Sequence, residues 1–293
     1  MAGGTGDLVT SESRNPDNDM RLTWVKFGAL RPGYRRSVNP DPQPPDDPGE
    51  RIDMSDSILR LSLFDGWRLV ADGEVLHTPA RSQRLIALLA LRGRQPRAQL
   101  AGTLWPDADG QRSAASLRAA LSALHRQLPG LVERDHGEVR LSDRVRVDVD
   151  EFRANAQAVL SGAMSALPTT IDHPTVTGGE LLPGWYDDWV MAECEPIRQL
   201  RLHVLEALAG RLISRGAYGQ ALQTALLAVE LDPLRESAHR LVIQVHHAEG
   251  NTVEAVREYE QFRSVLRREL DVEPTRQMTE LMDEVIAPAH SRA

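Results

Sequence analysis

The side chains with the clearest chemistry in this sequence are arginines that gather in residues 81–128. This segment holds eight arginines against two acids, whereas the whole chain has a formal net charge of -8. Guanidinium groups pair with phosphates and, in the major groove of DNA, with the edge of guanine. Positive charge gathered in one segment of an acidic protein is typical of a surface that contacts a nucleic-acid backbone. The segment therefore predicts DNA binding.

Two other groups of side chains could in principle do chemistry, but their spacing argues against it. Cys194 and His203 would be about 13 Å apart on one helix, too far to act as a nucleophile and its base. His246 and His247 are adjacent, so on a helix they point about 100° apart and would not share an ion with Glu249. The sequence thus predicts no catalytic residues and no metal site.

Composition narrows the class of protein further. The chain has 293 residues, enough for about two domains, and its one cysteine excludes an internal disulfide framework. It has no apolar run of the ~18–20 residues that a membrane span needs, and no secretion signal. Its one lysine, Lys26, does not follow a glycine, so the chain lacks a phosphate-binding P-loop. We expect a cytoplasmic, nucleoid-associated protein that is not an enzyme and needs no cofactor.

The local pattern predicts the elements that carry the arginines. Residues 1–57 contain a proline- and acid-rich stretch at 39–49 and are expected to be a disordered leader. Residues 58–79 alternate as strands around two Asp-Gly turns. Three helices are expected at 81–92, 99–105 and 111–128, ended by Gly93, Pro106 and Pro129, and residues 131–149 read as a hairpin and a third strand. A sheet, three helices and a hairpin in this order predict a winged-helix DNA-binding domain at 58–149.

The third of these helices has two contrasting sides. At about 100° per residue, its leucines form one stripe that should pack on the other two helices. Arginine, alanine and serine fall on the opposite side, where they could enter the major groove. Further basic groups at the ends of the supporting helices, Arg84 among them, and on the hairpin are expected to contact phosphates. The residues predicted to bind DNA are Arg81, Arg94, Arg97, Arg112, Ser113, Ser116, Arg118, Ala119, Ser122, Arg126, Arg134, His136 and Arg140.

The second half of the chain is expected to be helical and repetitive. Residues 150–180 are a linker with a connecting helix, and residues 168–179 are expected to form a loop. From 181 to 293, Gly216-Ala217-Tyr218 recurs as Gly250-Asn251-Thr252, at an offset of 34 residues. That period is typical of tetratricopeptide-like helix pairs. The fold class is therefore mainly α with a small β part, a winged helix followed by an all-α domain of tetratricopeptide-like repeats.

Three motifs in this chain resemble segments of a known family. Residues 104–107 (LWPD) and 181–189 (LLPGWYDDW), together with residues 269–275 (ELDVEPT), are similar to segments of the Streptomyces antibiotic regulatory proteins. The resemblance extends over residues 59–285. It implies a winged-helix domain joined to a bacterial transcriptional activation domain, with the recognition helix at 112–128 and its common basic position at Arg118. Because no P-loop or receiver domain is found, a small two-domain member is expected.

The resemblance also implies partners. They are double-stranded promoter DNA with direct repeats near the -35 region, RNA polymerase holoenzyme contacted through its sigma factor, and a second copy of the chain on DNA. The genes controlled would form a secondary-metabolite cluster. An alternative stays open on the residues alone, namely a repeat scaffold for proteins whose winged helix no longer binds DNA. DNA binding that falls steeply with salt would separate the two hypotheses.

Overall fold

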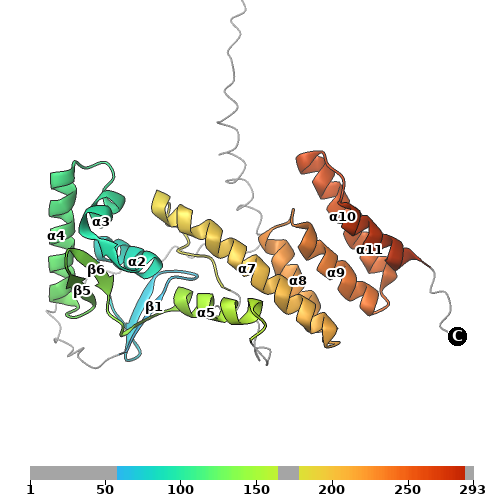
Figure 1. Cartoon of the computed structure of the whole chain (residues 1–293), viewed down its shortest axis with the longest axis horizontal. Coiled ribbons are helices and arrows are strands. Elements are labelled where there is room, and N and C mark those ends of the chain that lie inside the picture. Colours follow the sequence, from blue (N-terminus) through green and yellow to red (C-terminus); the bar gives the residue numbers. More distant parts are fainter. Residues whose placement is uncertain (1–57, 164–177, 288–293) are drawn as a thin grey trace, which may run out of the picture. The chain divides into compact units, whose positions relative to one another are not determined.

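The computed structural model describes residues 58–163 and 178–287. The predicted leader, nearly all of the loop predicted at 168–179, and residues 288–293 lie outside this part. Within it the chain is mainly helical, with two small sheets near the start, so the predicted fold class is confirmed (Figure 1).

The first sheet has four strands in the order β3-β2-β1-β7. The turn between β2 and β3 has positive φ at Asp72 (49°) and Gly73 (92°), as a tight hairpin requires. β7 pairs parallel with β1 and ends at Val147, earlier than predicted, because α5 already begins at Asp148. The carboxylate of Asp148 accepts hydrogen bonds from the backbone N–H groups of Leu63 and Phe64, which ties the start of α5 to the end of β1. The strands are β1 (Leu59–Ser62), β2 (Arg68–Ala71), β3 (Glu74–Val75) and β7 (Val145–Val147).

Three helices and a second sheet complete the predicted winged helix. Gly93 ends the first helix with φ 68°, and the predicted helices begin and end within two residues of the observed ones. The hairpin β5–β6 forms the wing, and β4 adds to its β6 edge. The elements are α2 (Ala80–Arg92), β4 (Gln95–Pro96), α3 (Arg97–Leu104), α4 (Gly110–Gln127), β5 (Val132–Asp135) and β6 (Glu138–Leu141).

The LLPGWYDDW motif joins the winged helix to the helices that follow. Leu182 N donates to Leu63 O at 2.8 Å, and Leu181 forms a β-bridge with Phe64. Trp185 lies just before α7 (Asp188–Ser214), and its ring packs edge-to-face on the buried Trp189 in the first turn of that helix. α5 (Asp148–Leu160) also packs on α7, and a single hydrophobic core runs from β1 and α2 through α5 into α7.

Helices α7 to α10 form two pairs, which α11 follows. The chain turns at Gly216 between α7 and α8, and at Gly250 between α9 and α10, with φ of 72° and 77°. Ala217 and Asn251 then have almost the same φ and ψ, -83° and 58° against -84° and 57°, so the 34-residue period corresponds to a repeated local geometry. The elements are α8 (Tyr218–Leu231), α9 (Glu236–Ala248), α10 (Thr252–Leu270) and α11 (Arg276–Ile286).

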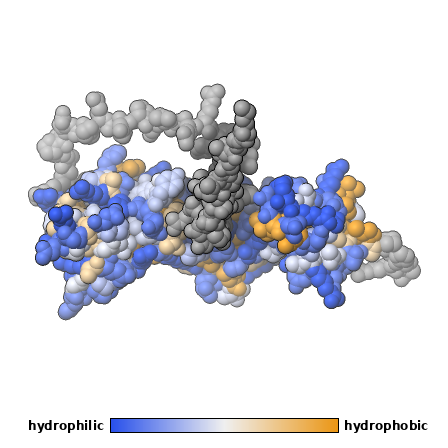
Figure 2. Space-filling model, turned by 90° about the horizontal axis from the view of Figure 1, so that it is seen from above, coloured by the Kyte–Doolittle hydropathy of each residue, from blue (hydrophilic) through white to orange (hydrophobic). Residues whose placement is uncertain are grey.

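Surface hydropathy differs between the two ends of the described chain. Figure 2 shows a mostly hydrophilic surface over the winged-helix end, whereas the larger hydrophobic areas in this view lie over the helical repeats. Exposed large apolar side chains of the repeats are Leu226, Val253, Leu270, Val272 and Ile286. In this view the end that carries the arginines is therefore the more polar of the two.

Candidate nucleic-acid interface

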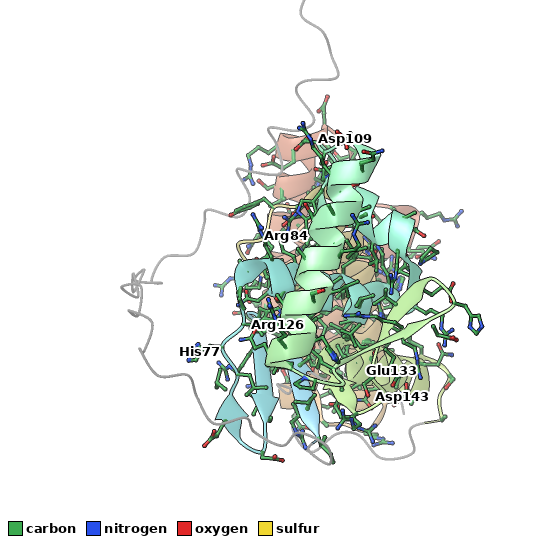
Figure 3. All side chains as sticks on the ribbon, turned by 90° about the vertical axis from the view of Figure 1, so that its left-hand side faces the viewer. His77, Arg84, Asp109, Arg126, Glu133 and Asp143 are labelled. Carbon is green, nitrogen blue, oxygen red and sulfur yellow. The ribbon has the colours of Figure 1, made fainter. Side chains whose placement is uncertain are left out.

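Helix α4 separates its leucines from its arginines as the sequence predicts. Leu117, Leu121 and Leu124 are at most 3% exposed and pack in the winged-helix core. Arg118 and Arg126 are exposed on the other side of the helix. Figure 3 shows α4 with Asp109 at one end and Arg126 towards the other, in front of the rest of the domain in this view. The predicted residues Ala119 and Ser122 are exposed on the same side.

The start of α4 is fixed by a side-chain cap. The carboxylate of Asp109 accepts a hydrogen bond from Arg112 N at 2.8 Å and so satisfies one of the free N–H groups of the first turn. Arg112 also lies 3.4 Å from that carboxylate, but its side chain remains 84% exposed. A pair this exposed contributes little and can exchange Asp109 for a phosphate.

Four of the predicted arginines have no acidic partner among residues 58–163 and 178–287. Arg118 and Arg126 lie on α4, Arg81 lies in the first turn of α2, and Arg97 begins α3. All four are exposed. Unpaired guanidinium groups lose no ion pair when they bind phosphate, so these four are the strongest candidates for contact with DNA.

The prediction was wrong about the side of the helix on which Ser113 lies. Ser113 is 4% exposed, and its hydroxyl donates to Gly110 O at 3.2 Å. It precedes Leu117 by four residues and therefore belongs to the leucine stripe. This spacing can be read from the sequence alone. Ser116 is half-buried at the edge of that stripe.

The wing holds its cations in internal contacts. Arg140 pairs with Glu133 and with Asp143, each at 2.6 Å, and its hydrogen bond to Asp143 raises the pKa of the guanidinium. Arg94 lies 3.6 Å from Asp135 and 3.4 Å from Glu138.

The other two residues predicted on the wing also have partners. His136 is 93% exposed and pairs with the neighbouring Asp135. Arg134 donates to Leu121 O at 2.8 Å and so ties the wing to α4. The wing's basic residues are thus less available to phosphate than their number suggested.

Two further arginines of the basic segment pair with acidic residues at the start of α7 instead. Arg84 pairs with Asp187, and Arg92 pairs with Glu193 at 2.8 Å. These pairs require the tertiary structure, because their members are about a hundred residues apart. Arg84, which was expected to lie where a phosphate backbone passes, lies at the seam with α7.

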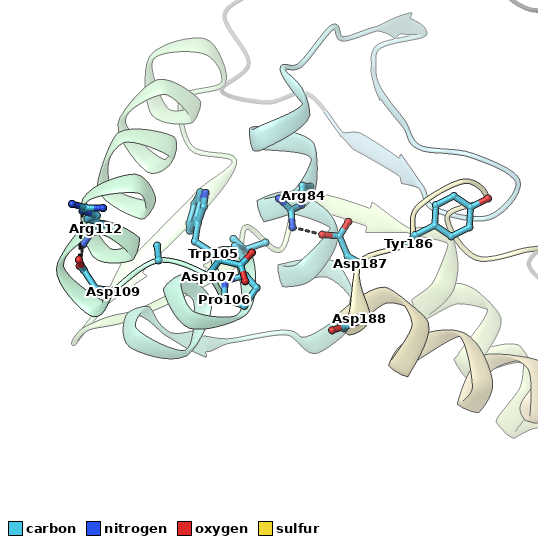
Figure 4. Close-up of a pocket in the computed structure, with 11 residues that line it drawn as sticks. Arg84, Trp105, Pro106, Asp107, Asp109, Arg112, Tyr186, Asp187 and Asp188 are labelled. Carbon is cyan, nitrogen blue, oxygen red and sulfur yellow. Dashed lines mark hydrogen bonds and ion pairs between the residues drawn. The ribbon is translucent and has the colours of Figure 1, made fainter. Parts of the chain in front are cut away.

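A groove of about 590 Å³ opens at this seam. One wall is the loop 105–109 with the first turn of α4, and the other is the segment 186–188 (Figure 4). The Arg84–Asp187 pair lies between the walls, and Arg112 pairs with Asp109 at the far side. Both arginines of the groove pair with carboxylates, but only the Arg84–Asp187 pair is largely shielded from solvent.

The described residues also bear on metal binding, membrane insertion and thiol reactivity. No group of three or more histidine, cysteine, aspartate or glutamate side chains among them could hold a metal ion. None of the helices in those same ranges is long and apolar enough to cross a membrane. Burial raises the pKa of the Cys194 thiol, with acidic neighbours adding to the effect, which disfavours the reactive thiolate.

Comparison with known proteins shows which domain and which regulators this chain resembles. The model of the bacterial transcriptional activator domain matches residues 177–286. The regulatory protein AfsR of Streptomyces coelicolor is 26% identical over 242 residues, covering 78% of this chain and 24% of AfsR. AfsR of Streptomyces griseus is 24% identical over 264 residues, covering 86% and 27%. The chain thus spans about a quarter of the length of these relatives.

A solved structure has the same fold. EmbR of Mycobacterium tuberculosis, in complex with a low-affinity phosphopeptide, superposes with a TM-score of 0.65 at 16% identity, covering 78% of this chain and 65% of EmbR. The winged helix, the activator-domain match and the AfsR relatives agree with the motifs found in the sequence. The chain thus carries a bacterial transcriptional activator domain at residues 177–286 and is similar to the AfsR regulatory proteins of two Streptomyces species.

Proposed function

We propose that this regulator is a sequence-specific transcriptional activator that inserts α4 into the major groove of promoter DNA. The observation that carries the proposal is that Arg118 and Arg126 are exposed on the side of α4 opposite its buried leucines and have no acidic partner in the described part of the chain. Ala119 and Ser122 lie between them and leave room for close approach to base edges. Arg81, Arg97 and Arg112 would position the helix through phosphates.

The proposal extends to the wider role implied by the family. The protein would act in the cytoplasm at the nucleoid, bind direct repeats near the -35 region and recruit RNA polymerase holoenzyme through its sigma factor. Its targets would be the genes of a secondary-metabolite cluster. The winged helix has a polar face that bears arginines, and the helical repeats form a different part of the chain. This supports the proposal that the winged helix binds DNA and the repeats contact polymerase. Transcript levels of the neighbouring genes should fall when the gene is deleted.

A mobility-shift titration with the region upstream of the gene tests DNA binding. We expect the affinity to fall steeply with salt, because Arg and Lys contacts release counterions from the phosphates. Arg118→Ala and Arg126→Ala should each weaken binding by ~1–3 kcal/mol if they contact bases. A matched control is Arg257→Ala together with Arg276→Ala, because these arginines are 70% and 90% exposed on α10 and α11.

The outcomes separate the activator from a repeat scaffold. Weaker binding by the α4 variants and unchanged binding by the control variant support the activator. Unchanged binding after both α4 substitutions would mean that another element reads DNA. If the wild-type protein binds no upstream duplex at any salt concentration, the winged helix is not a DNA-binding module and the scaffold hypothesis holds.

A further inference from the structure

The groove between the loop 105–109 and the segment 186–188, which we name the seam groove, combines flat rings with acidic side chains. Its volume of about 590 Å³ lies within the range of small-molecule sites, roughly 300–1,000 Å³. The size therefore admits a small organic molecule, and the chemistry of the lining decides which kind.

Two carboxylates of the seam groove have no cationic partner. Each of the two arginines in the lining pairs with an aspartate, as described above. These pairs leave Asp107 on the winged-helix wall and Asp188 at the start of α7, both of them exposed. Neither forms an ion pair within residues 58–163 and 178–287. The lining therefore carries an excess of negative charge, drawn from both walls, and attracts a cation.

Aromatic rings lie beside these carboxylates. Trp105 is half-buried and packs on the winged-helix core, whereas Tyr186 is 84% exposed. Figure 4 shows the two rings on opposite sides of the Arg84–Asp187 pair in this view. The faces of such rings attract cations and stack on other rings. An exposed tyrosine also loses little packing when it turns onto a ligand.

The guanidinium of Arg84 adds a flat polar surface between the two rings. Planar guanidinium groups stack on aromatic rings. Since Asp187 compensates the charge of this guanidinium, it repels a cationic ligand less than a free arginine would. The groove thus offers flat surfaces for a ring and carboxylates for a positive charge.

We propose that the seam groove binds a small organic cation, an aromatic ring that carries an alkylamine. The ring lies against Trp105 and Arg84, and the ammonium group lies near Asp107 and Asp188. An anion would meet the unpaired carboxylates and is disfavoured. A metal ion would lack ligands, because no suitable group of three or more side chains exists in the described ranges. This site goes beyond the proposed function and does not depend on DNA binding by α4.

The position of the groove gives an occupant contact with two parts of the chain. One wall leads directly into α4, and the other wall begins α7. A molecule bound between them therefore touches the winged helix and the first activator helix together.

The affinity for one small molecule is expected to be modest. The unpaired carboxylates are exposed, and an exposed ion pair contributes little. A ligand of about a dozen non-hydrogen atoms with the efficiency usual for small molecules has a Kd on the order of 1 mM. A method suited to weak binding is therefore needed.

Three probes separate the contribution of the ring from that of the charge. Tryptamine has a ring and an ammonium group, indole-3-acetate has the same ring with a carboxylate, and putrescine has two ammonium groups and no ring. Each is titrated onto the full chain at low salt and followed by saturation-transfer NMR. We expect tryptamine to bind with a Kd on the order of 1 mM and the other two to bind at least about fivefold more weakly.

The indole N–H resonances of the protein locate the bound tryptamine. The resonance of Trp105 can be assigned from its loss in Trp105→Phe, and it should shift during the titration. The resonance of Trp67 should stay in place, because Trp67 does not line the groove.

Two variants test the proposed contacts. D107N/D188N removes both unpaired charges and should weaken tryptamine binding by about tenfold. Its matched control is D271N/D283N, which removes two exposed charges from the repeats and should leave the affinity unchanged. Tyr186→Ala should weaken binding by about threefold. Circular dichroism verifies that each variant is folded.

Other results overturn the inference. If indole-3-acetate binds as tightly as tryptamine, the groove does not select a cation. If putrescine binds as tightly, the rings do not contribute. Unchanged affinity in D107N/D188N, or a shift at Trp67 without one at Trp105, would place the bound tryptamine elsewhere. None of these titrations contains DNA, so failure of the proposed DNA-binding function would not alter them.

Discussion

Arg84 of α2 forms an ion pair with Asp187, the residue that caps α7, across 103 positions of the chain. Their side chains are 34% and 24% exposed, so the pair is neither fully solvated nor fully buried. Together with Arg92 and Glu193 it fastens the winged helix to the first activator helix. Arg84, which the sequence suggests as a phosphate contact, therefore stabilises the contact between the winged helix and α7.

Replacement of Arg84 by alanine should lower the free energy of unfolding by about 1 kcal/mol, more than an exposed pair and less than a buried one. It should leave the salt dependence of DNA binding unchanged. Arg112→Ala is the control for stability, because its pair with Asp109 is far more exposed and its loss should stay within about 0.5 kcal/mol. Urea unfolding and salt titrations measure both effects. A salt slope lowered by about 1 in Arg84→Ala would instead show that Arg84 contacts phosphate.

The two sides of α4 should respond differently to truncation. Leu121→Ala removes a side chain that is 3% exposed and should cost about 2–5 kcal/mol of stability. Ser122→Ala, one position on, changes an exposed side chain and should shift stability by less than about 0.5 kcal/mol. Chemical denaturation compares the two variants. Equal losses would mean that the described faces of α4 are misassigned.

The repeat turns should be sensitive to the loss of glycine. Gly216 and Gly250 have positive φ, and a Cβ at either would meet nothing within 4 Å, so Gly→Ala should cost about 1–2 kcal/mol at each through backbone strain alone. Gly210 provides the matched control. It lies inside α7 with equal space, and Gly210→Ala should stabilise the protein by up to about 1 kcal/mol. A stabilising effect at Gly216 would contradict the repeated left-handed turn.

Acid should lower the stability of the helical repeats by protonating Glu206 of α7. Burial raises the pKa of Glu206, but the hydrogen bonds from Arg235 and Ser237 and the charge of Arg235 outweigh it, so the pKa lies below the usual 4.5. A carboxyl with a lowered folded-state pKa adds stability above its unfolded pKa and loses it as the pH falls through the folded value. The wild type should therefore lose more stability than Glu206→Gln between about pH 5 and pH 3. Urea midpoints across this range measure the difference, and parallel curves would refute the assignment.

Much of the architecture follows from local sequence signals. Some sequence signals favour one local conformation each, and the structure adopts it. They are the Asp-Gly turns, the helix end at Gly93 after α2 and the leucine spacing of α4. The period of 34 residues can be recognised in the sequence because the turns at Gly216 and Gly250 have the same local geometry. Local rules could not show that β7 joins β1 in parallel, because that pairing joins residues about 86 positions apart in the chain.

The side-chain partners were harder to predict than the elements. The spacing of the leucines in α4 predicts which face of the helix points outwards. The same spacing places Ser113, four residues before Leu117, on the buried leucine side. The sequence shows that Arg140 and Arg94 are basic, but only the folded hairpin brings Glu133, Asp143 and the other carboxylates within reach of them. Charge counts along a segment therefore overstate the charge that is free to act on a ligand.

The core shared by β1, α2, α5 and α7 has a consequence for promoter layout. Because α7 is anchored in that core, the helical repeats cannot rotate freely relative to the winged helix. If the chain activates transcription as proposed, moving its operator by about half a helical turn of DNA (~5 bp) should place the repeats on the opposite side of the duplex and abolish activation, and moving it by a full turn (~10 bp) should restore activation.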